Sequence, residues 1–336
     1  MKKRNKKLLL LCRFIGAGRR TTLLQATDKS FFGFKKELLP FPYLPFLTGI
    51  KSMRLPHLAA AFWAIASIAH AEPAIWQVQG QTAKIYLFGT MHLLPKHTDW
   101  LGPKIKSAFN DSAVLMEEAD IGMVSPLSIT TIMNRAESPD VDLFRMLPPK
   151  SAAKFSDMVR SCHLPNSVVT HFRPWFAAML PTMCAVMAEN AGSTAASAGP
   201  EGTFITMAKA SAKKIDFFET AQQQIGYLAD APDKVQLAEL EQSIDEGSPK
   251  ELDAMEASWA SGDVDAMSKL IQKDRFSDEQ SYETIFLHRN ERFAQRIEAL
   301  LNGHETIFVA IGAGHLAGPD SVQAQLAKHG VVAHRL

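Results

Sequence analysis

Two apolar stretches that each end in the pattern Gly-x-x-His constrain the fold of this chain more than any other feature. The first reads Tyr-Leu-Phe-Gly-Thr-Met-His and ends at His92, and the second reads Phe-Val-Ala-Ile-Gly-Ala-Gly-His and ends at His315. An apolar run that stops at glycine predicts a buried strand followed by a tight turn. In open α/β sheets, ligands bind just beyond the carboxyl ends of the strands. The repeated pattern therefore favours two histidines that converge on one site over two histidines with separate structural roles.

The order of the predicted elements indicates an α/β (α+β) fold, with a central mixed β-sheet flanked by helices. A hairpin is expected from residues 75–78 and 84–88, because two alternating runs flank a turn at Gly80. The pattern of residues 121–212 is mostly helical, and we expect it to form an inserted helical lobe within one domain, 72–336. Further strands are expected at 113–116, 214–218, 307–311 and 331–334, and further helices at 103–110, 221–273, 282–301 and 319–329.

The helix expected at 282–301 has a polar interruption in its apolar stripe. Apolar residues recur at spacings of three and four, but one turn of the buried side carries Arg289 and Asn290. A buried guanidinium without a partner is costly, so we expect Arg289 to pair with a carboxylate at a strand end, either Glu118 or Glu219. The alternative is an arginine whose charged end reaches past the stripe into solvent.

Five motifs in a fixed order resemble the TraB/GumN family, whose animal relatives are the Tiki proteins. They are Gly89-Thr-Met-His92, Glu118 with Asp120 two residues later, Phe218-Glu219-Thr220, Arg289-Asn290 and Gly312-Ala-Gly-His315, and the resemblance runs from about residue 75 to the C-terminus. The resemblance favours Glu118 over the adjacent Glu117 as the site residue. It also implies a fold distantly similar to that of erythromycin esterases. One departure is His288, which stands where the family usually has a glutamate before Arg-Asn.

The resemblance and the residue types both point to hydrolysis. Tiki proteins are described as metal-dependent peptidases, and two histidines with a carboxylate are suitable ligands for zinc, manganese or cobalt. We expect His92, Glu118 and His315 to hold the metal ion. Glu219 would then accept a proton, and Arg289, with Asn290 beside it, would contact a substrate carboxylate or the developing oxyanion. The expected substrate is a peptide or a small amide or ester.

Two alternatives remain open at this stage. One is a metal-independent hydrolase of the erythromycin-esterase kind, and the other is a non-catalytic peptide-binding protein, as suggested for pheromone-shutdown members of the family. Serine and cysteine nucleophiles are disfavoured, because the chain has no Gly-x-Ser-x-Gly turn and no cysteine beside the motifs. The turn at 312–314 could present N–H groups to an anion, but a nucleotide site is disfavoured because the full phosphate-binding signatures are missing.

The beginning of the chain predicts export. Residues 1–52 carry a net charge of +10, although the whole chain carries only +1. We expect this extension to be disordered and to result from an over-extended gene start, with translation beginning at Met53. Residues 53–71 have a short basic start, an apolar centre and an Ala-His-Ala end, which predicts a signal peptide cleaved before Glu72 and a periplasmic or secreted protein. The alternative is a membrane anchor, for which the run is short.

Two further features bear on partners and on redox state. No nucleic-acid recognition motif accompanies the basic residues, so we expect no nucleic-acid partner, and contact with a membrane only through the signal segment. Cys162 and Cys184 follow the signal segment, and they could form one disulfide or remain two buried thiols. The sequence leaves the oligomeric state open.

Overall fold

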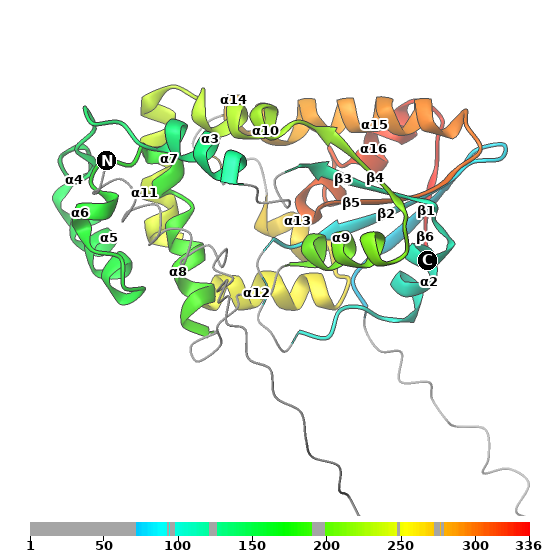
Figure 1. The fold of residues 1–336 in the computed structure, drawn as a ribbon, viewed down its shortest axis with the longest axis horizontal. Helices are drawn as coiled ribbons and strands as arrows, with labels where there is room; N and C mark the ends of the chain where they lie inside the picture. The colour runs from blue at the N-terminus through cyan, green and yellow to red at the C-terminus, as the bar shows by residue number, and fades with distance from the viewer. Residues whose placement is uncertain are drawn as a thin grey trace, which may run out of the picture. The chain divides into compact units, whose positions relative to one another are not determined.

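The computed structural model describes residues 72–92, 94, 98–120, 126–189, 199–246, 249–271, 276 and 279–336, which belong to one compact unit. A six-stranded mixed sheet with the order β4-β3-β5-β2-β1-β6 organises this unit (Figure 1). The strands are β1 (Ile75–Gln79), β2 (Lys84–Thr90), β3 (Val114–Ala119), β4 (Lys214–Glu219), β5 (Thr306–Gly312) and β6 (Ala333–Arg335). The expected disordered extension and signal peptide lie outside the described residues. Within the described ranges, no helix has the length and apolar character needed to cross a membrane.

Four neighbouring strands of the sheet, β4, β3, β5 and β2, run parallel, and the hairpin of β1 and β2 is antiparallel as predicted. The two strands that carry Gly-x-x-His, β2 and β5, are direct neighbours, with Thr90 opposite Gly312. Strand β3 pairs with the other side of β5, and β4 forms the adjoining edge of the sheet. Because parallel strands end at the same edge, these strands bring four of the predicted site residues to that edge: His92, Glu118, Glu219 and His315.

Helices cover both faces of the sheet. On one face, a core around Phe88, Phe204 and Phe308 forms against α2 (Pro103–Asp111), α9 (Pro200–Ala210), α12 (Pro249–Ala260) and α13 (Val264–Leu270). On the other face, Phe293 and Ile297 of α15 (His288–Leu301) and Leu326 of α16 (Val322–Lys328) pack on the sheet. Apolar side chains on both faces explain why the central strands read as nearly continuous apolar runs.

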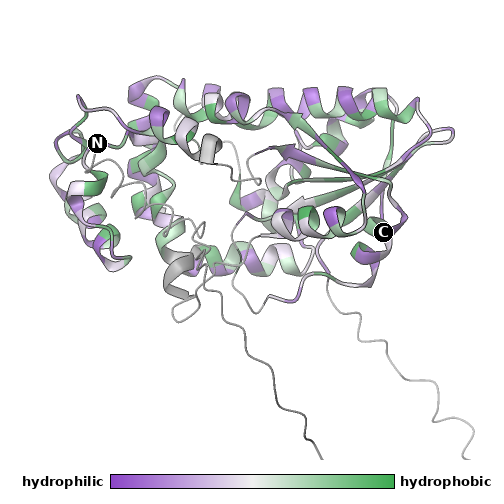
Figure 2. Cartoon of the chain, viewed as in Figure 1, coloured by the Kyte–Doolittle hydropathy of each residue, from purple (hydrophilic) through white to green (hydrophobic). Residues whose placement is uncertain are grey.

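A third apolar core lies away from the sheet and is built from helices and the short connections between them. The helices are α3 (Pro126–Ala136), α4 (Leu143–Met146), α5 (Pro149–Ser161), α6 (Asn166–Val169), α7 (Pro174–Ala177), α8 (Leu180–Glu189), α10 (Ala221–Ala229) and α11 (Asp233–Glu246). Apolar and polar residues alternate around these helices at helical spacing, as Figure 2 shows by its green and purple segments. This helical cluster includes α10 and α11, which follow β4, whereas α9 packs on the sheet. A disulfide between Cys162 and Cys184 joins the end of α5 to α8.

The helix expected at 282–301 is divided into three parts. A short helix α14 (Glu279–Tyr282) leads into a π-helical turn, Glu283–Leu287, and α15 follows. The backbone N–H of His288 donates to the carbonyl of Glu283, five residues earlier. The carbonyl of Ile285 accepts a hydrogen bond from the side chain of Arg289 at 3.3 Å. Such π turns occur frequently at functional sites, and this one precedes the Arg-Asn pair directly.

Candidate active site

The turns that follow β2 and β5 pack directly against each other. A side chain at Gly89 would place its Cβ 2.9 Å from the Cα of Ala313, closer than real Cβ contacts allow. The carbonyl of Gly89 accepts a hydrogen bond from the indole of Trp259 at 2.7 Å. Gly314 similarly leaves room for the ring of Phe286. Gly89 and Gly314 are therefore required by close packing, which glycine alone permits without a clash.

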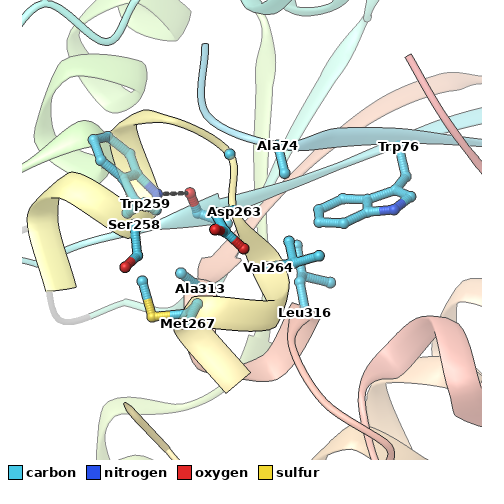
Figure 3. Close-up of a pocket in the computed structure, with 11 residues that line it drawn as sticks. Ala74, Trp76, Ser258, Trp259, Asp263, Val264, Met267, Ala313 and Leu316 are labelled. Carbon is cyan, nitrogen blue, oxygen red and sulfur yellow. Dashed lines mark hydrogen bonds between the residues drawn. The ribbon is translucent and has the colours of Figure 1, made fainter. Parts of the chain in front are cut away.

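A small pocket lies behind these turns, between β1, β2 and the α12–α13 connection (Figure 3). Its walls are mainly apolar and include Trp76, Met267 and Leu316, together with the polar side chains of Ser258 and Asp263. Its empty volume is about 270 Å³, including space open to solvent. Neither motif histidine lines it, so the chemistry suggested by the sequence has to be sought elsewhere.

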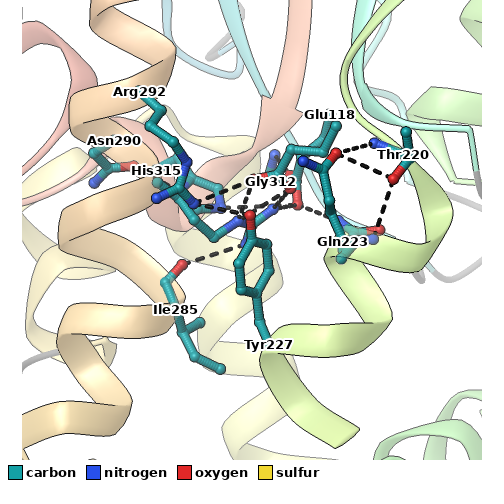
Figure 4. Close-up of polar contacts among 12 residues, drawn as sticks. Glu118, Thr220, Gln223, Tyr227, Ile285, Asn290, Arg292, Gly312 and His315 are labelled. Carbon is teal, nitrogen blue, oxygen red and sulfur yellow. Dashed lines mark hydrogen bonds and ion pairs between the residues drawn. The ribbon is translucent and has the colours of Figure 1, made fainter. Parts of the chain in front are cut away.

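Figure 4 shows the surroundings of Glu118, Gly312 and His315 at the carboxyl edge of the sheet. There, the buried guanidinium of Arg289 holds two carboxylates. Its Nη2 donates to Glu118 at 2.5 Å and to Glu219 at 2.7 Å, and its Nε donates to Glu219 at 3.0 Å. The prediction that Arg289 pairs with Glu118 or Glu219 is confirmed, and it pairs with both. Because Nη1 donates to Ile285, all three guanidinium nitrogens already have partners within the protein.

Glu118 is held from several directions. The backbone N–H of Gly312 donates to Oε2 at 2.8 Å, and the side-chain amide of Gln224 donates to Oε1. The turn after β5 thus presents an N–H group to an anion, as its sequence suggested, and the anion is a carboxylate of the protein itself. Burial alone would raise the pKa of Glu118, but His315, Arg289 and the N–H of Gly312 hold it below its usual range.

A chain of hydrogen bonds sets the tautomer of His315. The Nδ2 of Asn290 donates to the carbonyl of Asp320 at 2.8 Å, which turns the Oδ1 of Asn290 toward the imidazole. Nδ1–H of His315 donates to this oxygen at 2.6 Å, so in the neutral ring Nε2 carries a lone pair. Nε2 lies 3.8 Å from Oε1 of Glu118. Burial lowers the pKa of His315 to about 4, so the ring is neutral at pH 7.

His92 is exposed and has a partner that sequence reasoning missed. Its side chain is 69% exposed, and its Nδ1 lies 2.7 Å from Oε1 of Glu201, the second residue of α9. The negative charge of Glu201 raises the pKa of His92 to about 9. An acidic residue directly after Gly-Pro at a helix start was visible in the sequence, but nothing in its spacing connects Glu201 with His92.

Glu117 points away from this network. Successive strand residues face opposite sides of a sheet, and Glu117 is buried on the face covered by α9. Burial, followed by the charges of Glu201 and Asp120, raises the pKa of Glu117 to about 8. Among the described residues, its Oε1 finds no hydrogen-bond partner.

The structure thus joins five of the six predicted site residues by direct contacts: Glu118, Glu219, Arg289, Asn290 and His315. His92 is outside this hydrogen-bond network, although its charge contributes to the lowered pKa values of Glu118 and His315. The described part of the chain contains no group of three or more His, Cys, Asp or Glu arranged to hold a metal ion. The 3.8 Å between His315 Nε2 and Glu118 Oε1 is nevertheless short enough for both atoms to reach one ion through bonds of about 2 Å.

The comparison with protein families agrees with the order of the motifs. The model of the TraB/PrgY/gumN family matches residues 74–335. The chain belongs to this family. The match to the TraB/PrgY/gumN family spans the whole sheet, both Gly-x-x-His turns and the helical cluster. No curated protein and no solved structure matches the chain.

Proposed function

We propose that this TraB/PrgY/gumN protein is an exported hydrolase that cleaves peptide or amide bonds with the help of a divalent metal ion. The observation that supports this most is the presentation of His315: a neutral ring with its Nδ1–H held by Asn290 and its Nε2 facing Glu118. Metal-binding histidines commonly donate a hydrogen bond from the N–H of their second ring nitrogen to a neighbouring oxygen in this way. His92 is proposed as the third ligand, and zinc, manganese or cobalt as the ion.

In this proposal, the metal ion and the surrounding side chains have separate roles. A divalent ion held there would supply an activated water and polarise a substrate carbonyl. Arg289 and Glu219 fix the carboxylate of Glu118, and since all three guanidinium nitrogens are engaged, we assign Arg289 to orienting the site rather than to binding substrate. Both oxygens of Glu219 accept hydrogen bonds from Arg289, so we assign Glu219 to the same orienting role.

A second candidate is hydrolysis without a metal ion, and the electrostatics of the two histidines favour it. With a pKa near 9, His92 is a cation at pH 7 and can donate a proton to a leaving group. With a pKa near 4, His315 is neutral, and its Nε2 can accept a proton from water. Opposite pKa shifts on two groups of one site are typical of acid–base pairs.

Export to the periplasm or the medium is part of the proposal. The disulfide between Cys162 and Cys184 supports it, because structural disulfides persist in oxidising compartments. Mass spectrometry of the protein after expression in a secreting host tests it, and the expected chain begins at Glu72. A mature protein that still carries residues 1–52 contradicts it. The substrate would then be a peptide or a small amide or ester met outside the cytoplasm, with no nucleic-acid partner, and with the membrane contacted only through the signal segment.

Elemental analysis joined to peptide and ester turnover tests the reaction. Wild type, His92→Ala and His315→Ala are compared with His329→Ala, which removes a surface histidine paired with Glu298. The metal mechanism predicts a bound divalent ion, loss of turnover on chelation, and losses of about 100-fold or more in both site variants only. Full activity in the chelated sample with the same losses supports the acid–base pair instead. Peptide binding without turnover of any substrate supports the non-catalytic alternative and contradicts both mechanisms.

A further inference from the structure

Glu201 reaches His92 from a segment far away in the sequence. It is the second residue of α9, directly after Gly199 and Pro200, where the chain returns from the helical cluster to the sheet. Its side chain is only 18% exposed, although it carries a charge. Buried carboxylates usually have a partner, and the partner here is the histidine of the first motif.

The contact between Glu201 and His92 has a defined direction. A carboxylate carries no hydrogen, so the 2.7 Å distance means that Nδ1–H of His92 donates to Oε1 of Glu201. Within the described part of the chain, the other ring nitrogen, Nε2, of this exposed side chain has no hydrogen-bond partner. The position of α9 depends on Gly199, because a Cβ there would lie 2.6 Å from the carbonyl oxygen of Met91 and 2.7 Å from that of His92.

His92 and His315 are therefore held in the same way by unrelated residues. Each donates Nδ1–H to a side-chain oxygen, from Glu201 in one case and from Asn290 in the other. Nε2 is therefore the ring nitrogen left to contact a ligand in both cases, with a lone pair in neutral His315 and with a hydrogen in His92 while that ring is protonated. The oxygens differ in charge, because one belongs to a carboxylate and the other to an amide.

We propose that Glu201 is a positioning residue for the active site, which fixes the His92 ring through Nδ1 and directs Nε2 toward the substrate or metal ion. The identity of the group that Nε2 meets rests on the proposed function, but the positioning itself does not. The first turn of α9, a helix that packs on the sheet, thus supplies the residue that orients the histidine of the first motif.

Ring nitrogen NMR on ¹⁵N-histidine-labelled protein tests the positioning. Wild type and Glu201→Asp should show a slowly exchanging Nδ1–H signal of His92, assigned by its loss in His92→Gln. Glu201→Ala should lose the signal, and Glu298→Gln, which breaks the comparable surface pair with His329, should keep it. If Glu201→Ala does not fold, the near-isosteric Glu201→Gln takes its place, and a weakened, faster-exchanging signal is expected. An unchanged signal in Glu201→Ala or Glu201→Gln, or no signal in wild type, overturns the proposal.

Zinc affinity gives a second readout, which separates the positioning role of Glu201 from the proposed metal mechanism. Loss of a residue that orients a metal ligand typically weakens binding by about 10–100-fold. We expect such a loss for Glu201→Gln, and no change for Glu298→Gln. If wild type binds no zinc, the metal mechanism fails, while the NMR result still decides the role of Glu201. Zinc binding that is equally tight in wild type and Glu201→Gln contradicts the positioning role.

Discussion

At the scale of single residues, the site depends on how each buried charge is compensated. Arg289 balances Glu118 and Glu219 and leaves no guanidinium nitrogen without a partner. Burial keeps the His315 ring uncharged, and its Nδ1–H donates to the neutral amide of Asn290, whereas the carboxylate of Glu201 keeps His92 protonated. The two motif histidines thus differ in charge at pH 7, even though their local sequences are alike.

Replacement of Arg289 should be strongly destabilising. Arg289→Met leaves Glu118 and Glu219 buried without a counter-charge, and breaking a buried pair in this way costs about 3–5 kcal/mol. Urea unfolding at pH 7 measures the loss. The double variant Arg289→Met/Glu219→Leu should recover part of it, because one orphaned carboxylate is removed. A loss below about 1 kcal/mol for the single variant would show that the pair is better solvated than the structure indicates.

His315 should make the protein sensitive to mild acid. Its pKa is about 4 in the folded state, whereas an unperturbed histidine has a pKa of 6.5, so between these values the unfolded chain binds a proton that the folded chain does not. The free energy of unfolding therefore falls as the pH is lowered from about 6.5 to about 4, by roughly 2–4 kcal/mol. His315→Gln should flatten this part of the stability–pH curve in chelator-treated protein. Parallel curves for the two proteins contradict the shifted pKa.

At the scale of elements, the site lies at the carboxyl edge of four parallel strands, and glycines allow the turns after β2 and β5 to pack closely together. The π-helical turn before α15 supplies the carbonyl of Ile285 as an acceptor for Arg289. Gly89 allows the β2 turn to contact Ala313 of the β5 turn. The π-helical turn and the glycine turns are thus positioned by contacts with other elements as much as by their own hydrogen bonds.

Gly89→Ala should destabilise the protein through overpacking. The new Cβ would meet the backbone of Ala313 at 2.9 Å, which cannot yield as a side chain can. Overpacking of this kind costs about 1–3 kcal/mol. Gly226→Ala in α10 is the matched control: its nearest neighbour is the flexible Asp230 side chain at 3.2 Å, and alanine favours a helix by up to about 1 kcal/mol over glycine. Equal thermal midpoints for the two variants would contradict the packing argument.

At the scale of the whole described unit, the sheet and the helical cluster have separate apolar cores. Gln224 donates to Glu118 from α10, which belongs to the helical cluster, whereas Glu201 contacts His92 from α9, which packs on the sheet. The stability of the cluster therefore bears on the geometry of the site as well as on the fold.

Reduction of the disulfide should weaken the helical cluster. Cys162 and Cys184 are separated by 22 residues in sequence, and closing a loop of this size contributes about 3 kcal/mol by the chain-entropy argument. Thermal unfolding with and without a reductant should show a lower midpoint in the reduced wild type. The double variant Cys162→Ala/Cys184→Ala should unfold at the lower midpoint in both conditions. A wild-type midpoint that does not respond to complete reduction would contradict the contribution.

Apolar periodicity and turn residues were enough to locate the six strands within a few residues and to place Arg289 and Asn290 on a buried helix face, and the family resemblance favoured Glu118 over Glu117 as a carboxylate that Arg289 binds. These features depend on local spacing, which the sequence contains directly. The family, too, was evident from the order of the motifs. Whether the two cysteines pair was open, because spacing alone does not determine which thiols meet.

Only the tertiary structure determined which groups fix the protonation state and the tautomer of each histidine. The partnership of Glu201 with His92 joins segments 109 residues apart, and the fixed amide of Asn290 depends on a backbone carbonyl of Asp320. The sequence likewise did not show that all three guanidinium nitrogens of Arg289 donate hydrogen bonds to oxygens of the protein. The physical reason is that protonation and tautomer follow from burial and from the nearest charges, and these are set by packing between elements rather than by the order of residues within one.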